Sequence, residues 1–221
     1  MIACGALGRE LVDVIRATGL TNVDVTCLPA GLHNRPSEIP EAVARRLTAR
    51  RDRTGGAGPY ARVFVAYADC GTGGMLDRVL EAEGIERLPG AHCYEVYAGA
   101  AAFARLSTEE PGTFYLTDFL ARNFERLVVS GLGLDRHPEL LGTYFGNYRR
   151  LVYLSQADDP GLVQAARRAA DRLGLAFEHR PTGHGELRTG ILAAAGSPVG
   201  AGGPIATGAG GPIATGAVGA A

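Results

Sequence analysis

Residues 62–67 read RVFVAY, and the chain continues through ADCGTGG to Gly74. The first six residues are β-branched, aromatic and almost continuously apolar, which is typical of a strand that is buried on both faces. The amphipathic stretch from Thr72 to Glu83 predicts a helix, which ends at Gly84. A buried strand followed by a turn and a helix is the repeating unit of a parallel α/β sheet.

The same order of strand and helix recurs on both sides of this segment. Short apolar runs alternate with amphipathic stretches, and this repetition predicts a mostly parallel sheet with right-handed crossovers. We therefore expect an α/β fold with three layers, in which helices cover both faces of the sheet. The predicted strands are residues 2–4, 23–28, 62–67, 85–88, 150–154 and 176–179, and the predicted helices are residues 8–18, 36–51, 72–83, 94–106, 117–129, 138–145 and 160–173.

Composition predicts one domain, residues 1–196, followed by a tail, residues 197–221. The chain has 221 residues, of which 46% are hydrophobic, and this is enough for one sizeable core. The tail repeats eight residues, GPIATGAG and then GPIATGAV, without charged or aromatic side chains. Because such a segment buries too little apolar surface to offset its ordering entropy, we expect it to be disordered.

Charge and hydropathy exclude two classes of partner. The formal net charge of −1 gives no basic excess for nucleic acid, and no apolar run reaches the roughly 18 residues that cross a bilayer. The first residues, MIACGALGRELVD, lack the basic start and apolar core of a secretory signal, so we expect a cytoplasmic protein. Because Met1 directly precedes the first strand, we also expect the natural start to lie further upstream. A small-molecule ligand is the expected partner, and the oligomeric state stays open.

Three segments share a strand, a cysteine-containing turn and a helix. They read ACGALGREL at residues 3–11, YADCGTGGMLD at residues 67–77 and LPGAHCYEVY at residues 88–97. In a parallel sheet all such turns lie at the carboxyl edge, where ligands bind. We therefore expect Cys4, Cys70 and the pair His92-Cys93 to converge, with their thiols reduced in the cytoplasm.

A metal centre is one interpretation of this convergence. Thiolate, imidazole and carboxylate ligands suit zinc or an iron centre, and three thiolates can also hold an iron–sulfur cluster. The expected metal ligands are Cys4, Cys70, His92, Cys93 and Glu95. Because the chain has no CxxC pair, the site depends wholly on the fold bringing the turns together.

The glycine-rich turn after Cys70 supports a second interpretation. Free backbone N–H groups at the start of a helix stabilise an anion, either a bound ligand or the Cys70 thiolate. We therefore expect a lowered pKa for the Cys70 thiol, which makes it a candidate nucleophile. The turn is neither a Walker A motif nor a regular GxGxxG. The expected ligand-binding residues are Gly71, Thr72, Gly73, His33 and Asn34.

Two further polar stretches supply candidate catalytic residues. His184 lies between two glycines after the last strand, and an imidazole there suits acid–base chemistry. Asp135 and Arg136 lie in a tight turn and would orient an anionic substrate. Structural roles are the alternatives: helix or turn capping for Asp69, Glu95 and Asp135, a hydrogen bond within its own loop for His33, an exposed loop position for His184, and burial as a small hydrophobic side chain for Cys27.

These segments together resemble the domain-of-unknown-function 1638 family. They read IACGAL, LPAGLHNRP, VFVAYADCGTGG, GAHCYE, PGTFYLTDFL, GLGLDRHPEL and GHGEL, and they are spread over residues 2–190. The resemblance implies a prokaryotic protein of a family without a settled activity. Some members of that family lie among genes for corrinoid-dependent methyl transfer.

Two function classes stay open. The first is a metal-dependent enzyme, in which zinc or iron activates a water or a thiol toward a small molecule. The second is a non-catalytic accessory protein that carries a metal, a corrinoid or an anionic metabolite for other enzymes. A corrinoid carrier normally shows Asp-x-His-x-x-Gly. The nearest approach here is Asp135-x-His137, with Leu140 in place of the glycine.

Overall fold

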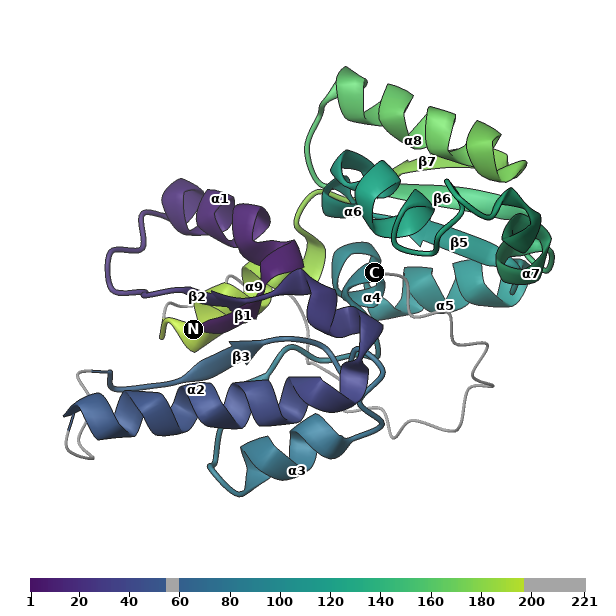
Figure 1. The fold of residues 1–221 in the computed structure, drawn as a ribbon. Helices are drawn as coiled ribbons and strands as arrows, with labels where there is room; N and C mark the ends of the chain where they lie inside the picture. Colours follow the sequence, from purple (N-terminus) through teal and green to yellow (C-terminus); the bar gives the residue numbers. More distant parts are fainter. Residues whose placement is uncertain (55–59, 197–221) are drawn as a thin grey trace.

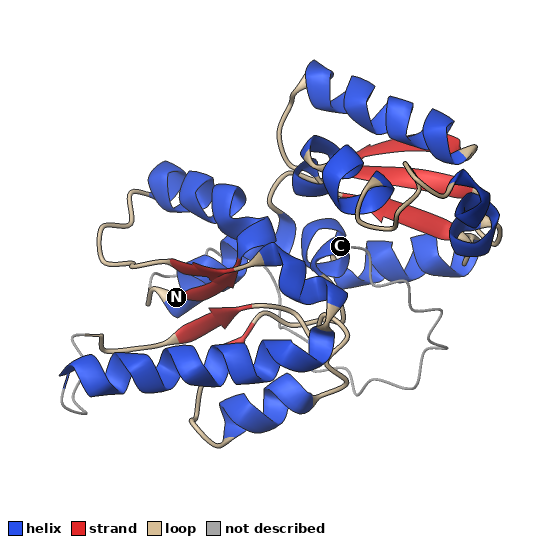
Figure 2. Ribbon diagram, in the orientation of Figure 1, coloured by secondary structure: helices blue, strands red, loops and turns tan. Residues whose placement is uncertain are grey.

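The structure, a computed structural model, describes residues 1–54 and 60–196 and has two lobes (Figure 1). In the described part of the chain, the strands form one sheet of order β2-β1-β3-β4 and a second sheet of order β5-β6-β7, and all paired strands are parallel (Figure 2). The α/β class with parallel strands is therefore confirmed. The strands form two sheets, however, where one was expected.

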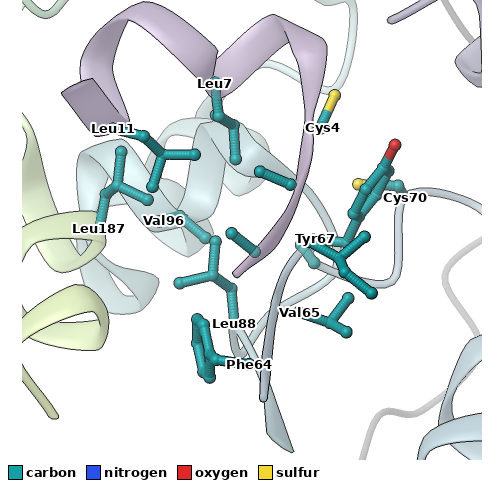
Figure 3. Packing of buried hydrophobic residues seen from close by; sticks show 14 of the residues in the cluster. Cys4, Leu7, Leu11, Phe64, Val65, Tyr67, Cys70, Leu88, Val96 and Leu187 are labelled. Carbon is teal, nitrogen blue, oxygen red and sulfur yellow. The ribbon is translucent and has the colours of Figure 1, made fainter. Parts of the chain in front are cut away.

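The N-terminal lobe comprises residues 1–98 and the last helix, α9. Its strands are β1 (Ile2–Cys4), β2 (Thr26–Leu28), β3 (Phe64–Ala66) and β4 (Glu86–Arg87), and its helices are α1 (Gly8–Thr18), α2 (Ile39–Thr54), α3 (Met75–Glu81), α4 (Cys93–Ala98) and α9 (Gly185–Ala194). Successive residues of β3 face opposite sides of the sheet. Figure 3 shows Phe64 on the side of Leu11 and Leu187, whereas Val65 and Tyr67 lie on the other side.

The second lobe has a sheet with helices on both faces. Its elements are α5 (Ala100–Glu109), β5 (Thr113–Leu116), α6 (Asp118–Arg122), α7 (Leu141–Phe145), β6 (Arg150–Ser155), α8 (Pro160–Leu173) and β7 (Ala176–Pro181). Leu151 and Tyr153 of β6 pack with side chains of α6 and α8. Val152 and Leu154 pack instead with Phe103 and Leu106 of α5. The alternation along β6 therefore produces the three expected layers within this lobe.

Strand β5 explains why two sheets form. Residues 113–116, TFYL, were not predicted as a strand, because the run is only four residues long between a Pro-Gly turn and a predicted helix. In the structure β5 pairs with β6, and β4 pairs with β3. The predicted helix at residues 94–106 is also divided, since Gly99 has a φ of +79° and separates α4 from α5.

Helix α9 returns the chain from the second lobe to the first, and it was not predicted. Its residues Leu187 and Ile191 are fully buried in the core of the N-terminal lobe. The boundary of a single domain at residue 196 stays a prediction, and the predicted disordered tail lies outside the described residues. No helix in the described part of the chain is long and apolar enough to cross a membrane.

Candidate functional site

The structure brings the three cysteine-containing turns together at the carboxyl edge of the first sheet. Cys4 ends β1 and is 2% exposed, Cys70 follows β3 and is 8% exposed, and Cys93 begins α4. The backbone N–H of Cys70 donates to the carbonyl of Ala91 at 2.8 Å, which ties the second turn to the third. The three thiols are close enough to interact, since Cys4 raises the pKa of Cys70, and Cys4 and Cys70 both raise the pKa of Cys93.

The expected lowering of the Cys70 pKa is wrong. Burial raises the pKa of the Cys4 thiol to about 11 and that of the Cys70 thiol to about 12, and it raises the pKa of Cys93 as well. A protonated thiol is a poor nucleophile. The structure therefore does not support a metal-free nucleophilic role for Cys70.

The carboxylate of Asp69 already occupies the predicted anion site. It accepts hydrogen bonds from the Thr72 hydroxyl at 2.7 Å, the Gly73 N–H at 3.1 Å and the Gly74 N–H at 2.9 Å. Burial opposes ionisation of Asp69, but these hydrogen bonds together lower its pKa. The capping alternative for Asp69 is therefore confirmed.

His33 lies beside Cys4. Its Nδ1 is 3.0 Å from the carbonyl oxygen of Ala30 and 3.7 Å from the Cys4 sulfur, and its Nε2 is 4.0 Å from the same sulfur. Burial lowers the pKa of His33, so its neutral form is favoured. With the Nδ1 proton donated to Ala30, Nε2 carries the free lone pair of the ring and lies near the Cys4 sulfur.

Tyr67 completes the group of buried polar atoms at this edge. The His33 ring stacks on the Tyr67 ring at a centroid distance of 6.1 Å. Figure 3 shows Tyr67 beside Cys4 and Cys70. The Tyr67 hydroxyl is buried, and among the described residues its partner is the Cys4 thiol, a weak hydrogen-bonding group, with no closer nitrogen or oxygen partner. The sequence did not indicate a functional role for Tyr67, because this residue is the last of a predicted buried strand.

His92 and Glu95, which were expected as metal ligands, are less well placed for that role than His33. His92 is exposed, although partial burial of its ring lowers its pKa. One Glu95 oxygen accepts a hydrogen bond from the N–H of Ala91 at 2.8 Å, so this carboxylate braces the turn before α4. Among the described residues, no three His, Cys, Asp or Glu side chains lie in an arrangement that could hold a metal ion as they stand.

Of the other expected site residues, Gly71, Thr72 and Gly73 form the turn directly after Cys70, whereas Asn34 and the three expected catalytic residues show no hydrogen bond with a cysteine in the described part of the chain. Asp135 and Arg136 are exposed, and their charged groups are 3.8 Å apart in the turn before α7, far from the first sheet (Figure 1). His184 is half-buried and directly precedes α9. Within residues 1–54 and 60–196, the structure gives none of these three, nor the exposed Asn34, a contact with a cysteine.

One more correction follows from sheet topology. Cys27 is exposed, contrary to the expected burial, because it lies on the edge strand β2.

A surface hollow lies at the amino ends of β3 and β4, at the opposite edge from the thiols. It is lined by Leu47, Tyr60, Ala61, Arg62, Val63, Glu83, Gly84, Ile85 and Glu86.

A second buried polar group, which the sequence did not reveal, lies at the carboxyl edge of the second sheet. Asp118 is fully buried and accepts hydrogen bonds from the Tyr153 hydroxyl at 2.6 Å and the Gln156 N–H at 3.0 Å. His179 Nε2 lies 2.9 Å from the hydroxyl of Ser155. In the sequence, Thr117 and Asp118 directly follow TFYL. This pair indicates a polar site at a strand end only if TFYL is recognised as a strand.

Comparison with known proteins gives one match. A family model described as "Protein of unknown function (DUF1638)" matches residues 27–191, a range that includes Cys70 and Cys93 and begins after Cys4. No curated protein and no solved structure matches the chain. Because the matched range is well over half of the 221 residues, the chain belongs to the DUF1638 family.

Proposed function

We propose that this protein binds a thiophilic metal ion, zinc or iron, through Cys4, Cys70 and Cys93 and uses it on a small molecule. The observation that carries the proposal is the meeting of three shielded thiols at the ends of neighbouring strands. Burial raises the pKa of each thiol, and repulsion from the neighbouring thiols raises the pKa of Cys70 and Cys93 further, so thiolates are disfavoured in the metal-free protein. A metal cation reverses this effect, because it replaces the thiol protons and stabilises the thiolates.

His33 is the fourth ligand that the geometry favours, in place of Glu95. Its Nδ1 contact with the Ala30 carbonyl is the kind of interaction that orients the other ring nitrogen toward a metal. Three cysteines and one histidine form a common zinc-binding set. Since the side chains do not yet surround a common point, binding requires the thiols and the His33 ring to rotate.

The Tyr67 hydroxyl gives independent support for a ligand at this edge. The buried hydroxyl has the Cys4 thiol as its partner, and a thiol is a weak acceptor, so the cost of burying the hydroxyl is only partly offset. A water or an anionic substrate group bound to the metal would supply a stronger acceptor. The backbone of Cys70 also supports a functional site here. Cys70 is a non-glycine residue with a φ of +51°, and backbone strain of this kind clusters at functional sites.

Metal content of protein purified anaerobically without chelator tests the proposal. We expect about one zinc or iron per chain, as in known thiolate sites. Replacement of Cys4, Cys70 and Cys93 by serine should abolish the metal, whereas Cys27→Ser is the matched control and should retain it. Full metal occupancy in the triple variant, or a folded wild-type protein without metal, would contradict the proposal.

A non-catalytic accessory role is the second candidate, including one linked to corrinoid-dependent methyl transfer. The observation that favours it is the position of Asp135 and Arg136 in the second lobe, away from the thiols, because it leaves the site without the residues that were expected to orient a substrate. A carrier should release its metal rapidly to a competing chelator. A catalytic centre should retain the metal under the same conditions.

A further inference from the structure

An ion pair joins the two lobes at a buried position. Glu10 of α1, in the N-terminal lobe, is 3% exposed, and its Oε1 lies 3.6 Å from Nη1 of Arg122 of α6, in the second lobe. Arg122 also lies 3.4 Å from the buried Asp118 carboxylate. One arginine therefore faces two buried carboxylates, one from each lobe.

Glu10 is the poorly compensated member of this group. Its Oε2 is buried and has no hydrogen-bond partner among the described residues. Asp118, by contrast, accepts hydrogen bonds from the Tyr153 hydroxyl and from the N–H groups of Gln156 and Ala157. An ionised carboxylate that is buried with one long charged contact is costly, and opening the contact to water would relieve that cost.

The charged and titratable groups around Glu10 do not cancel the rise in its pKa that burial causes. Burial raises the pKa of Glu10, a hydrogen bond from its own backbone N–H and the Arg122 charge lower it, and the Asp118 and Asp13 carboxylates raise it further. Tyr97 of α4 also interacts with Glu10. The two charged residues of α9, the remaining helix that packs on α1, are Glu186 and Arg188, and both are exposed.

We propose that ionisation of Glu10 loosens the contact between α1 and α6 and that its protonation tightens this contact. The sign follows from linkage, because a carboxyl group that binds protons more tightly in the closed arrangement favours that arrangement at low pH. The two chain crossings, before α5 and before α9, keep the lobes attached, so the change is a local opening. The proposal holds whether or not the thiols bind a metal.

Hydrogen exchange of amides in α1 and α6, corrected for intrinsic rates, tests this inference at about pH 5 and about pH 8, which bracket a raised carboxyl pKa. We expect faster exchange at the higher pH, by about tenfold for each pKa unit between the closed and open arrangements. Glu10→Gln should exchange slowly at both pH values. The exposed Glu125→Gln is the control and should behave as the wild type.

The substitution Arg122→Gln provides a second test of the proposal. Removing the cation that faces Glu10 should raise the Glu10 pKa and move the midpoint of the exchange transition to higher pH. An unmoved midpoint would overturn the proposal. A wild-type protein without pH dependence, or a Glu10→Gln variant that keeps it, would also overturn the proposal.

Discussion

At the scale of single residues, the position of a cysteine in the sheet decides the chemistry of its thiol. Cys4 ends the central strand β1 and Cys70 lies in the turn after the central strand β3, and both are buried, whereas Cys27 lies within the edge strand β2 and is exposed. Burial disfavours the thiolate, which is the reactive form. Neighbouring strand ends can therefore carry thiols of very different reactivity.

Alkylation with iodoacetamide at neutral pH should follow this difference. We expect Cys27 to be modified first in the native protein, because it is the exposed thiol. Cys4 and Cys70 should resist until denaturant unfolds the chain, since the pKa values of about 11 and about 12 leave few thiolates. Peptide mass spectrometry identifies the sites. Faster modification of Cys70 than of Cys27 would contradict this account and favour a nucleophilic Cys70.

Asp69→Ala should destabilise the turn that carries Cys70. The substitution removes the acceptor of three hydrogen bonds, for which we expect a loss of about 1–3 kcal/mol in the free energy of unfolding. Asp69→Asn keeps one acceptor oxygen and should lose less, as urea denaturation can measure. Because hydrogen bonding lowers the folded-state pKa of Asp69, its contribution is present above the ordinary carboxyl pKa and is lost on acidification. Equal loss in both variants would argue against this role.

At the scale of elements, the link between α4 and α9 depends on a glycine. Gly185 has a φ of +48°, and a Cβ atom there would lie 2.2 Å from the carbonyl oxygen of Tyr97 and 2.6 Å from that of Val96. The backbone of α9 can therefore approach the end of α4 only without a side chain at this position.

Gly185→Ala should consequently be much more destabilising than Gly183→Ala. Gly183 also has a positive φ, of +57°, but a Cβ there would meet nothing within 4 Å. We expect about 1 kcal/mol for Gly183→Ala, from backbone strain alone. Gly185→Ala adds a backbone clash and should cost several times more in urea denaturation. Equal costs would show that α9 does not dock as described.

The elements that the sequence predicted best carry their own start and stop signals. Helix α1 matches the predicted residues 8–18, and α8 matches residues 160–173, because each has an amphipathic pattern and ends before a left-handed glycine. Strand β5 and helix α9 were missed, since a four-residue strand and a helix that starts inside a Gly-His-Gly turn have weak local signals.

The same limit applies to the candidate site. The convergence of Cys4, Cys70 and Cys93 could be predicted, because it follows from the strand–turn–helix order of a parallel sheet. The contacts of Cys4 with His33 and with the Tyr67 hydroxyl depend on how a loop packs over the sheet, and no local pattern encodes that packing. Glu95 has ligand chemistry, but only the structure shows that a backbone N–H already engages it.

At the scale of the whole molecule, the end of the described chain stabilises its beginning. Leu187 of α9 is fully buried beside Leu11 and Val96 in the core of the N-terminal lobe (Figure 3). The N-terminal lobe is therefore complete only after the second lobe has been made and the chain has returned.

Leu187→Ala should therefore weaken the N-terminal lobe selectively. We expect a loss of about 2–5 kcal/mol, as for other buried leucines, with faster hydrogen exchange in α1 and α4 than in β5, β6 and β7. Leu173→Ala, in the core of the second lobe, is the matched control and should show the reverse pattern. Equal acceleration in both lobes for either variant would show that the lobes unfold as one unit.

The central claim is that Cys4, Cys70 and Cys93 act together as one metal site, and proton release during a zinc titration of the metal-free protein tests it most directly. Because burial raises the pKa of all three thiols, zinc binding at neutral pH should release about three protons per ion. Cys27→Ser should release the same number, and the triple serine variant should release none. Stoichiometric zinc binding without proton release, or no binding by the reduced and folded protein, would contradict the claim.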